Sequence, residues 1–232
     1  MEKTEKNRFD VIVAGAGMAG LGTALALAVL KRKVLVVTRK GMKGESSPAA
    51  GGILDPLLEM NPGSFFLPFC LRAFRDWPAA LRQLEKKTGL KIGYQTSGML
   101  YGALSQKEAE ILAERYRWQK SLGIKTQWLT RTEILKKEPL LSPEVLSGLF
   151  YPEIGRVQPR RLLKVLFEAA RKSGIQFCFS SELPQIKTKN GKVAGVQTGK
   201  KFYEAPTVVN ATGSWAGIRQ GLGPAAPVKP AR

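Results

Sequence analysis

Residues 9–20 read Phe-Asp-Val-Ile-Val-Ala-Gly-Ala-Gly-Met-Ala-Gly, and this stretch decides the fold. Its first part, 9–14, is a short apolar run with β-branched residues, which predicts a buried parallel strand. The Ala- and Leu-rich segment at 18–30 predicts a helix, and a second apolar run at 34–38 predicts another strand. A strand, a helix and a strand in such close succession predict a βαβ unit.

Three glycines occupy the turn between the first strand and the helix, because Gly15, Gly17 and Gly20 form a G-x-G-x-x-G pattern. In a dinucleotide-binding fold, the first glycine permits a tight turn and the second lets the backbone approach a pyrophosphate. The third allows the helix to pack closely on the strand. The positive end of the helix dipole and its free N–H groups then bind the phosphates. The motif therefore predicts a dinucleotide site, with a glycine-rich turn that binds no ligand as the alternative.

The second strand ends in Thr38 and Arg39, where dinucleotide-binding proteins commonly carry an acidic residue that binds the adenosine ribose. Thr38 can hydrogen-bond a hydroxyl group, but without charge assistance we expect this bond to be weaker. Arg39 leaves open a phosphate on the ribose, and hence NADP as the ligand.

The next stretch, residues 46–54, reads Ser-Ser-Pro-Ala-Ala-Gly-Gly-Ile-Leu. Its hydroxyl groups, small side chains and unobstructed backbone N–H groups favour a surface that lies along a pyrophosphate and beneath a planar ring. A flexible surface loop is the alternative for this stretch.

The chain is strongly basic, with 37 Lys and Arg against 18 Asp and Glu and a formal net charge of +19. Basic chains can bind phosphate backbones, but these cations are scattered over the polar sides of helical patterns, so we expect no nucleic-acid partner. The absence of histidine excludes a Ser-His-Asp triad and histidine acid–base catalysis within the chain. Cys70 and Cys178 predict buried free thiols in a reducing, cytoplasmic environment, and a metal site is not expected.

Residues 11–30 carry no charged side chain, which raises the alternative of a membrane span or a signal peptide. However, Gly15, Gly17, Gly20 and Gly22 lie in the middle of this segment. Because glycine costs a helix roughly 1 kcal/mol relative to alanine, a strand, a turn and a helix explain the segment better than one span. We therefore expect no stable membrane insertion.

The rest of the chain mixes helical and strand patterns. Helices are predicted at 64–87, 105–122, 131–137 and 158–173, and strands within 92–101 and at 175–179, 185–189, 192–198 and 207–211. Asn190-Gly191 predicts a hairpin turn between two of these strands.

The strand at 207–211 is expected to return to the sheet that the first strand begins, which makes the middle of the chain an insertion. We therefore predict an α/β fold with two intertwined regions. A Rossmann-like dinucleotide domain takes residues 1–90 and 151–218, and a mixed α+β domain takes residues 91–150 and 219–232.

Besides the glycine motif, several other sequence blocks are characteristic of one protein family. They are Val11–Gly20, Ser46–Leu54, Gly98–Leu100, Trp128–Thr130 with Glu133, Glu138-Pro139, Pro152-Glu153, Gly155–Leu162 and Val208–Trp215. In order and spacing, these blocks resemble the D-amino-acid oxidase superfamily of FAD-dependent oxidoreductases, and within it the glycine oxidase branch associated with thiamine biosynthesis. The chain departs from the family pattern at Thr38, where a glutamate is usual, and at Pro184, where a valine often touches the adenine.

The resemblance implies FAD as the cofactor and assigns residues to its parts. Met18 and Ala19 would contact the phosphates through their backbone, and Thr38 and Arg39 would lie by the adenosine ribose. The remaining assignments are Ser46 and Ser47 at the phosphate and ribityl region, Gly51, Gly52 and Ile53 near the isoalloxazine, Pro184 by the adenine, and Ala211, Thr212 and Gly213 over the pyrophosphate.

The resemblance also implies an activity, the oxidation of the amine of glycine or a related small amino acid. A hydride would pass from the substrate α-carbon to flavin N5, and the resulting imine would hydrolyse while O₂ is reduced to H₂O₂. The alternatives are another oxidase of the superfamily, acting on D-amino acids, sarcosine or glycerol-3-phosphate, and a non-catalytic nucleotide-binding remnant.

A substrate carboxylate requires a cation, ideally a bidentate arginine. In the resembled family this arginine lies in the C-terminal portion, and no residue of this chain matches it. We therefore assign no catalytic residue and expect the mixed domain to be incomplete and the chain to be deficient in turnover. Whether the chain forms a homo-oligomer is left open.

Overall fold

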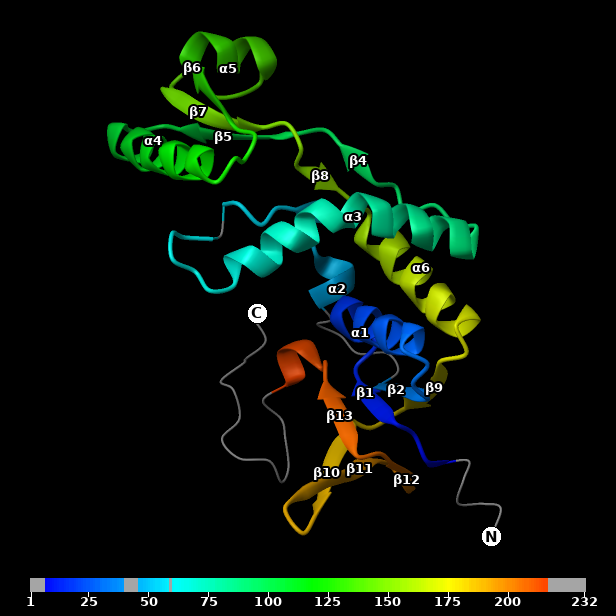
Figure 1. Cartoon of the computed structure of the whole chain (residues 1–232). Coiled ribbons are helices and arrows are strands. Elements are labelled where there is room, and N and C mark those ends of the chain that lie inside the picture. The colour runs from blue at the N-terminus through cyan, green and yellow to red at the C-terminus, as the bar shows by residue number, and fades with distance from the viewer. Residues whose placement is uncertain (1–6, 40–45, 59, 217–232) are drawn as a thin grey trace. The chain divides into compact units, whose positions relative to one another are not determined.

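A computed structural model of the chain describes residues 7–39, 46–58 and 60–216 (Figure 1). These residues form two compact units. Unit 1 comprises the described residues up to Gly51, Arg82–Ile92 and those from Pro159 onward, and unit 2 comprises Gly52–Leu81 and Gly93–Gln158. The predicted domain bounds differ from these units: the described residues of 52–81 and residues 151–158 belong to unit 2, and residues 91–92 belong to unit 1. Residues 219–232 lie outside the described part of the chain.

Unit 1 contains a four-stranded parallel sheet with the strand order β13-β1-β2-β9. Its strands are β1 (Val11–Ala14), β2 (Val34–Arg39), β9 (Gln176–Ser180) and β13 (Thr207–Asn210). Val11 lies beside Val34 of β2 on one side and Thr207 of β13 on the other. The predicted return of the last strand to the first one is therefore confirmed.

Helices cover one face of the parallel sheet, and a small antiparallel sheet covers the other (Figure 1). Helix α6 (Pro159–Lys172) contacts both α1 (Met18–Val29) and the short α2 (Ser46–Ala49). The other face carries Ile12, Leu35 and Val37, which pack against Val196 and Ala205. Because β1 is apolar at every position and buried throughout, the sheet can be covered on both faces, as parallel sheets require.

The antiparallel sheet of unit 1 has the order β10-β11-β12 and comprises β10 (Gln185–Lys189), β11 (Lys192–Thr198) and β12 (Lys201–Glu204). The turn between β10 and β11 has φ of 51° at Asn190 and 72° at Gly191. Two positive φ values are typical of the tight turn that matches strand twist, and Asn-Gly is the preferred sequence for it. The hairpin prediction is confirmed with its predicted strand bounds.

Unit 2 is a mixed α+β structure with two three-stranded sheets, ordered β3-β8-β4 and β5-β7-β6. The strands are β3 (Ile53–Leu54), β4 (Gln95–Thr96), β5 (Met99–Ala103), β6 (Gln127–Thr130), β7 (Ser147–Tyr151) and β8 (Gly155–Arg156). The helices are α3 (Leu67–Thr88), whose last part lies in unit 1, α4 (Gln106–Ser121) and α5 (Arg131–Lys137). Both α4 and α5 begin with a capping box, through Ser105 and Thr130.

A buried hydrogen-bond chain crosses the core of unit 2. The hydroxyl of Tyr151, which is only 1% exposed, donates to Gln119 Oε1 at 2.9 Å, and Gln119 Nε2 donates to the carbonyl of Leu57 at 2.9 Å. Burial raises the pKa of Tyr151 to about 12, since the interior disfavours the charged phenolate. The polar groups are thus satisfied inside an apolar cluster that includes Leu149 and Ile154.

Two further expectations can be compared with the structure. Cys70 and Cys178 are free thiols, as predicted, although both are half-buried rather than buried. Within the described residues, every helix is too short or too polar to cross a bilayer.

Candidate cofactor-binding site

A cavity of about 760 Å³ lies in unit 1 at the carboxyl ends of the parallel strands. In open α/β sheets, ligands bind outside the carboxyl ends of the strands. They bind at the point where the connections from neighbouring strands lead to opposite sides of the sheet. Strand β1 holds this position, with β2 on one side and β13 on the other. The cavity is lined by Gly15–Ala19, Val37–Arg39, Ser46, Ser47, Phe179, Leu183, Pro184 and Asn210–Ala216.

The turn after β1 brings two chain segments very close together. Gly15 has φ of +111°, and a Cβ atom there would lie 2.3 Å from the carbonyl oxygen of Ala211. The N–H of Gly15 donates to the Val37 carbonyl at 2.8 Å, and the N–H of Ala211 donates to the Ala14 carbonyl at 2.8 Å. Position 15 therefore requires glycine for both its backbone conformation and its space.

The other two motif glycines have different roles. A Cβ atom at Gly20 would lie 2.0 Å from the carbonyl oxygen of Gly15, so this residue allows α1 to pack against the turn. Gly20 does not itself line the cavity, whereas Gly17 does. A Cβ atom at Gly17 would lie 3.0 Å from the Ser47 hydroxyl, so the absence of a side chain leaves space for backbone and ligand.

The N-terminus of α1 faces this cavity and is suited to an anion. Gly17 is the N-cap residue and has no side chain to bind the first N–H groups. Instead, the Met18 N–H donates to the Ser47 hydroxyl at 3.1 Å. The helix dipole makes this end positive, and residues Gly17 to Ala19 line the cavity without any carboxylate in the first turn.

The segment after β13 closes another side of the cavity. Asn210 Oδ1 accepts hydrogen bonds from the Thr212 hydroxyl at 2.6 Å and from the Thr212 N–H at 3.3 Å. Asn210 Nδ2 donates to the carbonyl of Ala216 at 3.4 Å, and the Ser46 and Ser214 hydroxyls lie 3.3 Å apart. One asparagine side chain therefore holds the turn that includes Ala211, Thr212 and Gly213.

The end of β2 forms a further part of the wall. Thr38 is half-buried and Arg39 is exposed, and both line the cavity together with Phe179 and Pro184. Arg39 is the only charged residue of the lining among the described residues, so this region has positive rather than negative charge. The apolar ring of Phe179 in this lining suits contact with a planar base.

Most predicted site residues are thus brought together, but four are not part of this lining. Gly20 supports the turn from behind, as its packing requires. Gly51, Gly52 and Ile53 do not line the cavity, and Ile53 instead pairs with Arg156 in the β3–β8 ladder of unit 2. Their assignment to the isoalloxazine stays a prediction.

Sequence reasoning missed several lining residues, notably Phe179, Leu183, Asn210 and Trp215. Each lies at, or shortly beyond, the carboxyl end of β9 or β13. Because ligands bind at that edge, the predicted ends of those strands were the available signal.

The residues present fit a flavin dinucleotide. A pyrophosphate needs a backbone cradle free of side chains beside a helix N-terminus, and Gly15 to Ala19 provide both. The indole Nε1 of Trp215, which lines the same cavity, is buried and has no hydrogen-bond partner among the described residues. Such an orphaned donor is typical of a site from which a polar group is missing.

Comparison with known proteins agrees with this geometry. The family described as FAD dependent oxidoreductase (DAO) matches residues 10–232. The chain belongs to this family. The resemblance to the D-amino-acid oxidase superfamily and the Rossmann-like α/β fold with a mixed α+β part are therefore confirmed.

The chain is similar to several glycine oxidases of this family. The chain is 32% identical to the glycine oxidase of Geobacillus kaustophilus over 220 residues, which cover 93% of this chain and 58% of the relative. It is 31% identical to the bifunctional protein ThiO/ThiG of Trichormus variabilis, covering 89% of this chain and 31% of that protein. The chain thus spans little more than half of the first relative and about a third of the second.

Solved structures show the same fold. The crystal structure of the Geobacillus kaustophilus glycine oxidase matches with a TM-score of 0.81 and 29% identity, covering 90% of this chain and 56% of that one. The glycine oxidase of Bacillus cereus matches with a TM-score of 0.79 and 30% identity, covering 91% and 57%.

Proposed function

We propose that this chain binds FAD in the unit 1 cavity and supplies the cofactor-binding part of an oxidase that acts on glycine or a related small amino acid. The cradle at Gly15 to Ala19, with the Ser47 hydroxyl bound to the start of α1, carries the proposal. The glycine oxidase relatives, at 30–32% identity, support the amine substrate and a link to thiamine biosynthesis through the ThiO relatives. The two free thiols support a cytoplasmic location.

When bound, FAD would supply a two-electron acceptor for a hydride from the substrate carbon, with O₂ as the final oxidant. The described residues bind and orient the cofactor. Ala19 offers a backbone N–H group to the pyrophosphate at the positive helix end, while the N–H of Met18 is bound by the Ser47 hydroxyl. The turn fixed by Asn210 encloses the pyrophosphate from the β13 side. Thr38 offers a hydroxyl, and Arg39 a cation, to the adenosine end.

A second candidate substrate class comes from a more distant relative. The chain is 25% identical to the L-2-hydroxyglutarate dehydrogenase of Escherichia coli over 215 residues. That name describes a hydroxy acid, whose oxidation also transfers a hydride from carbon but yields no imine. The higher identity to glycine oxidases favours an amine.

Anaerobic single-turnover measurements separate these candidates without requiring efficient turnover. The purified chain is saturated with FAD and mixed in turn with glycine, sarcosine and L-2-hydroxyglutarate, and the flavin absorbance is followed. We expect slow bleaching with glycine or sarcosine and none with the hydroxy acid. Bleaching by the hydroxy acid alone, or by no substrate while FAD is bound, contradicts the proposed amine oxidation.

A further inference from the structure

One aromatic side chain lies in the unit 1 cavity beside the end of β2, where a dinucleotide fold binds adenosine. Phe179 of β9 pairs with Thr38 of β2 in the parallel ladder, and both residues line the cavity. Because side chains alternate between the two faces along each strand, paired residues share one face of the sheet. The Phe179 ring and the Thr38 hydroxyl therefore lie next to each other at the carboxyl edge.

Two neighbouring rings hold Phe179 in place. The Phe177 ring is stacked with it, at a centroid distance of 6.0 Å and an interplanar angle of 12°, and the Phe167 ring of α6 lies 6.1 Å away. Phe179 is nevertheless 47% exposed and contributes to the cavity lining. A ring that is fixed by two neighbours and still keeps nearly half of its surface accessible is preorganised to stack with one more planar group.

The other groups at this end of the cavity offer only a weak alternative for binding adenosine. Strand β2 ends in Thr38 and Arg39 instead of the acidic residue that commonly binds the ribose hydroxyls, and no carboxylate lines the cavity within the described residues. A neutral hydroxyl group makes a weaker hydrogen bond to the ribose than a carboxylate does. Stacking of a base on an aromatic side chain, by contrast, typically strengthens binding by roughly tenfold or more.

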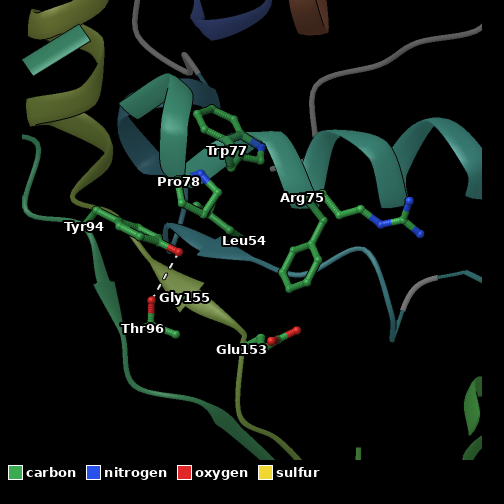
Figure 2. Close-up of a pocket in the computed structure, with 9 residues that line it drawn as sticks. Leu54, Arg75, Trp77, Pro78, Tyr94, Thr96, Glu153 and Gly155 are labelled. Atoms are coloured by element: carbon green, nitrogen blue, oxygen red, sulfur yellow. Dashed lines mark hydrogen bonds between the residues drawn. The ribbon is translucent and has the colours of Figure 1, made fainter. Parts of the chain in front are cut away.

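A second cavity, in unit 2, also has aromatic walls but differs in its other features. It measures about 370 Å³, and Trp77 and Tyr94 are part of its lining (Figure 2). The Tyr94 hydroxyl accepts a hydrogen bond from Thr96 Oγ1 at 3.2 Å, shown as the dashed line in Figure 2. Its lining includes neither a glycine-rich turn nor the start of a helix, so it offers no cradle for a pyrophosphate. Its aromatic residues therefore provide controls for Phe179.

We propose that Phe179 is the adenine-binding residue of this chain, and that stacking on its ring replaces the missing acidic residue in recognition of the adenosine. This inference rests on the proposed FAD site and adds the side chain that selects the base. The Thr38 hydroxyl binds the ribose, and Leu183 and Pro184 complete the apolar wall around the adenine. Since the contact is made by the base and not by the flavin, ADP alone occupies the same subsite.

Calorimetric titrations of the full chain with ADP and with FAD test the proposal. Phe179→Leu keeps an apolar side chain but removes the ring, so we expect about fivefold or more weaker binding of both ligands. Phe179→Trp keeps a stacking surface and should bind both within about twofold of the wild type. Trp77→Leu makes the same kind of change in the unit 2 cavity and should leave both affinities within about twofold.

Inorganic pyrophosphate, measured as a competitor of ADP, separates a lost base contact from a damaged site. It has no base, so Phe179→Leu should leave its affinity unchanged. Unaltered binding of ADP and FAD by Phe179→Leu, or an equal loss of pyrophosphate binding, overturns the role of Phe179, and FAD binding by the wild type then still supports the proposed function. A wild-type chain that binds ADP in a Phe179-dependent way but does not bind FAD contradicts the proposed function instead.

Discussion

The hydroxyl oxygen of Ser47 accepts a hydrogen bond from the backbone N–H of Met18 at 3.1 Å, across 29 positions of sequence. Gly17, the N-cap residue of α1, has no side chain that could make this bond itself. The cap is therefore supplied by another helix, α2, and the chain gains a side-chain-free backbone at the place where a pyrophosphate must approach. Ser47 of α2 thus stabilises the start of α1, while Gly17 leaves space for the cofactor.

Replacement of Ser47 by alanine tests this relationship. The start of α1 loses its cap, so we expect the free energy of unfolding to fall by about 1 kcal/mol, with weaker FAD binding. Urea unfolding and titration with FAD measure the two effects. Ser46→Ala is the control for the unfolding measurement, because the Ser46 hydroxyl lies 3.3 Å from the half-buried Ser214 hydroxyl and makes no hydrogen bond to α1 within the described residues. Equal losses of unfolding free energy in the two variants would contradict the capping role.

Two glycines of α1 provide a matched pair for the packing of the glycine turn. Gly20→Ala places a methyl group only 2.0 Å from the Gly15 carbonyl oxygen. Because this distance is a severe clash, the helix must move away. We expect destabilisation of about 1–3 kcal/mol and loss of FAD binding. Gly22→Ala meets no atom within 4 Å and should stabilise the helix by up to about 1 kcal/mol. Thermal unfolding of both variants checks this, and a tolerated Gly20→Ala would contradict the structure.

Asn210 is predicted to position the turn that encloses the cofactor. Asn210→Ala removes the acceptor of two hydrogen bonds from Thr212, at 2.6 and 3.3 Å. We expect about 1 kcal/mol lower stability and about tenfold weaker FAD binding, measured by flavin fluorescence. Asn190→Gly, in the hairpin turn, should leave FAD binding unchanged. Unaltered FAD affinity in Asn210→Ala would show that the turn is fixed by other contacts.

Alkaline pH should weaken the core of unit 2. Burial raises the pKa of Tyr151 from 10.0 to about 12, so the folded chain retains a proton that the unfolded chain releases. The stabilisation is complete below pH 10 and is lost as the pH rises towards 12, on the order of 2 kcal/mol in total. Tyr151→Phe should flatten this part of the pH dependence in urea unfolding, and an unchanged slope would contradict it.

A half-buried tyrosine provides an independent check in unit 1. Burial raises the pKa of Tyr203 to about 12, and its hydroxyl lies 3.3 Å from the Cys178 sulfur. In a spectrophotometric titration, Tyr203→Phe should remove one phenol that ionises near pH 12, and Tyr151→Phe should remove the other. Loss of a phenol that titrates near pH 10 in either variant would contradict the raised pKa of that tyrosine.

Local chemistry made much of unit 1 predictable. The apolar run of β1, the glycine turn and the Asn190-Gly191 hairpin each depend on residues close in sequence, and all form as predicted. The return of β13 to β1 was also predictable, because a buried strand at the end of an α/β pattern requires a partner.

Unit 2 was less predictable because its strands depend on distant partners. Strand β7 (Ser147–Tyr151) follows a loop with Pro139 and Pro143, and its pattern Ser-Gly-Leu-Phe-Tyr gives no clear alternation. It becomes the central strand only through pairing with β5 and β6. Likewise, the cap from Ser47 to α1 could not be inferred, since it joins segments whose approach is set by tertiary packing.

FAD binding in the unit 1 cavity can be measured by titrating the purified chain with FAD. We expect a stable complex, recognised by the flavin absorbance band after gel filtration and by quenching of flavin fluorescence. Gly15→Ala, which places a Cβ atom 2.3 Å from the Ala211 carbonyl, should abolish the complex. A folded wild-type chain that stays colourless with excess FAD, or a Gly15→Ala variant that binds FAD as tightly as the wild type, would contradict the proposed pyrophosphate cradle.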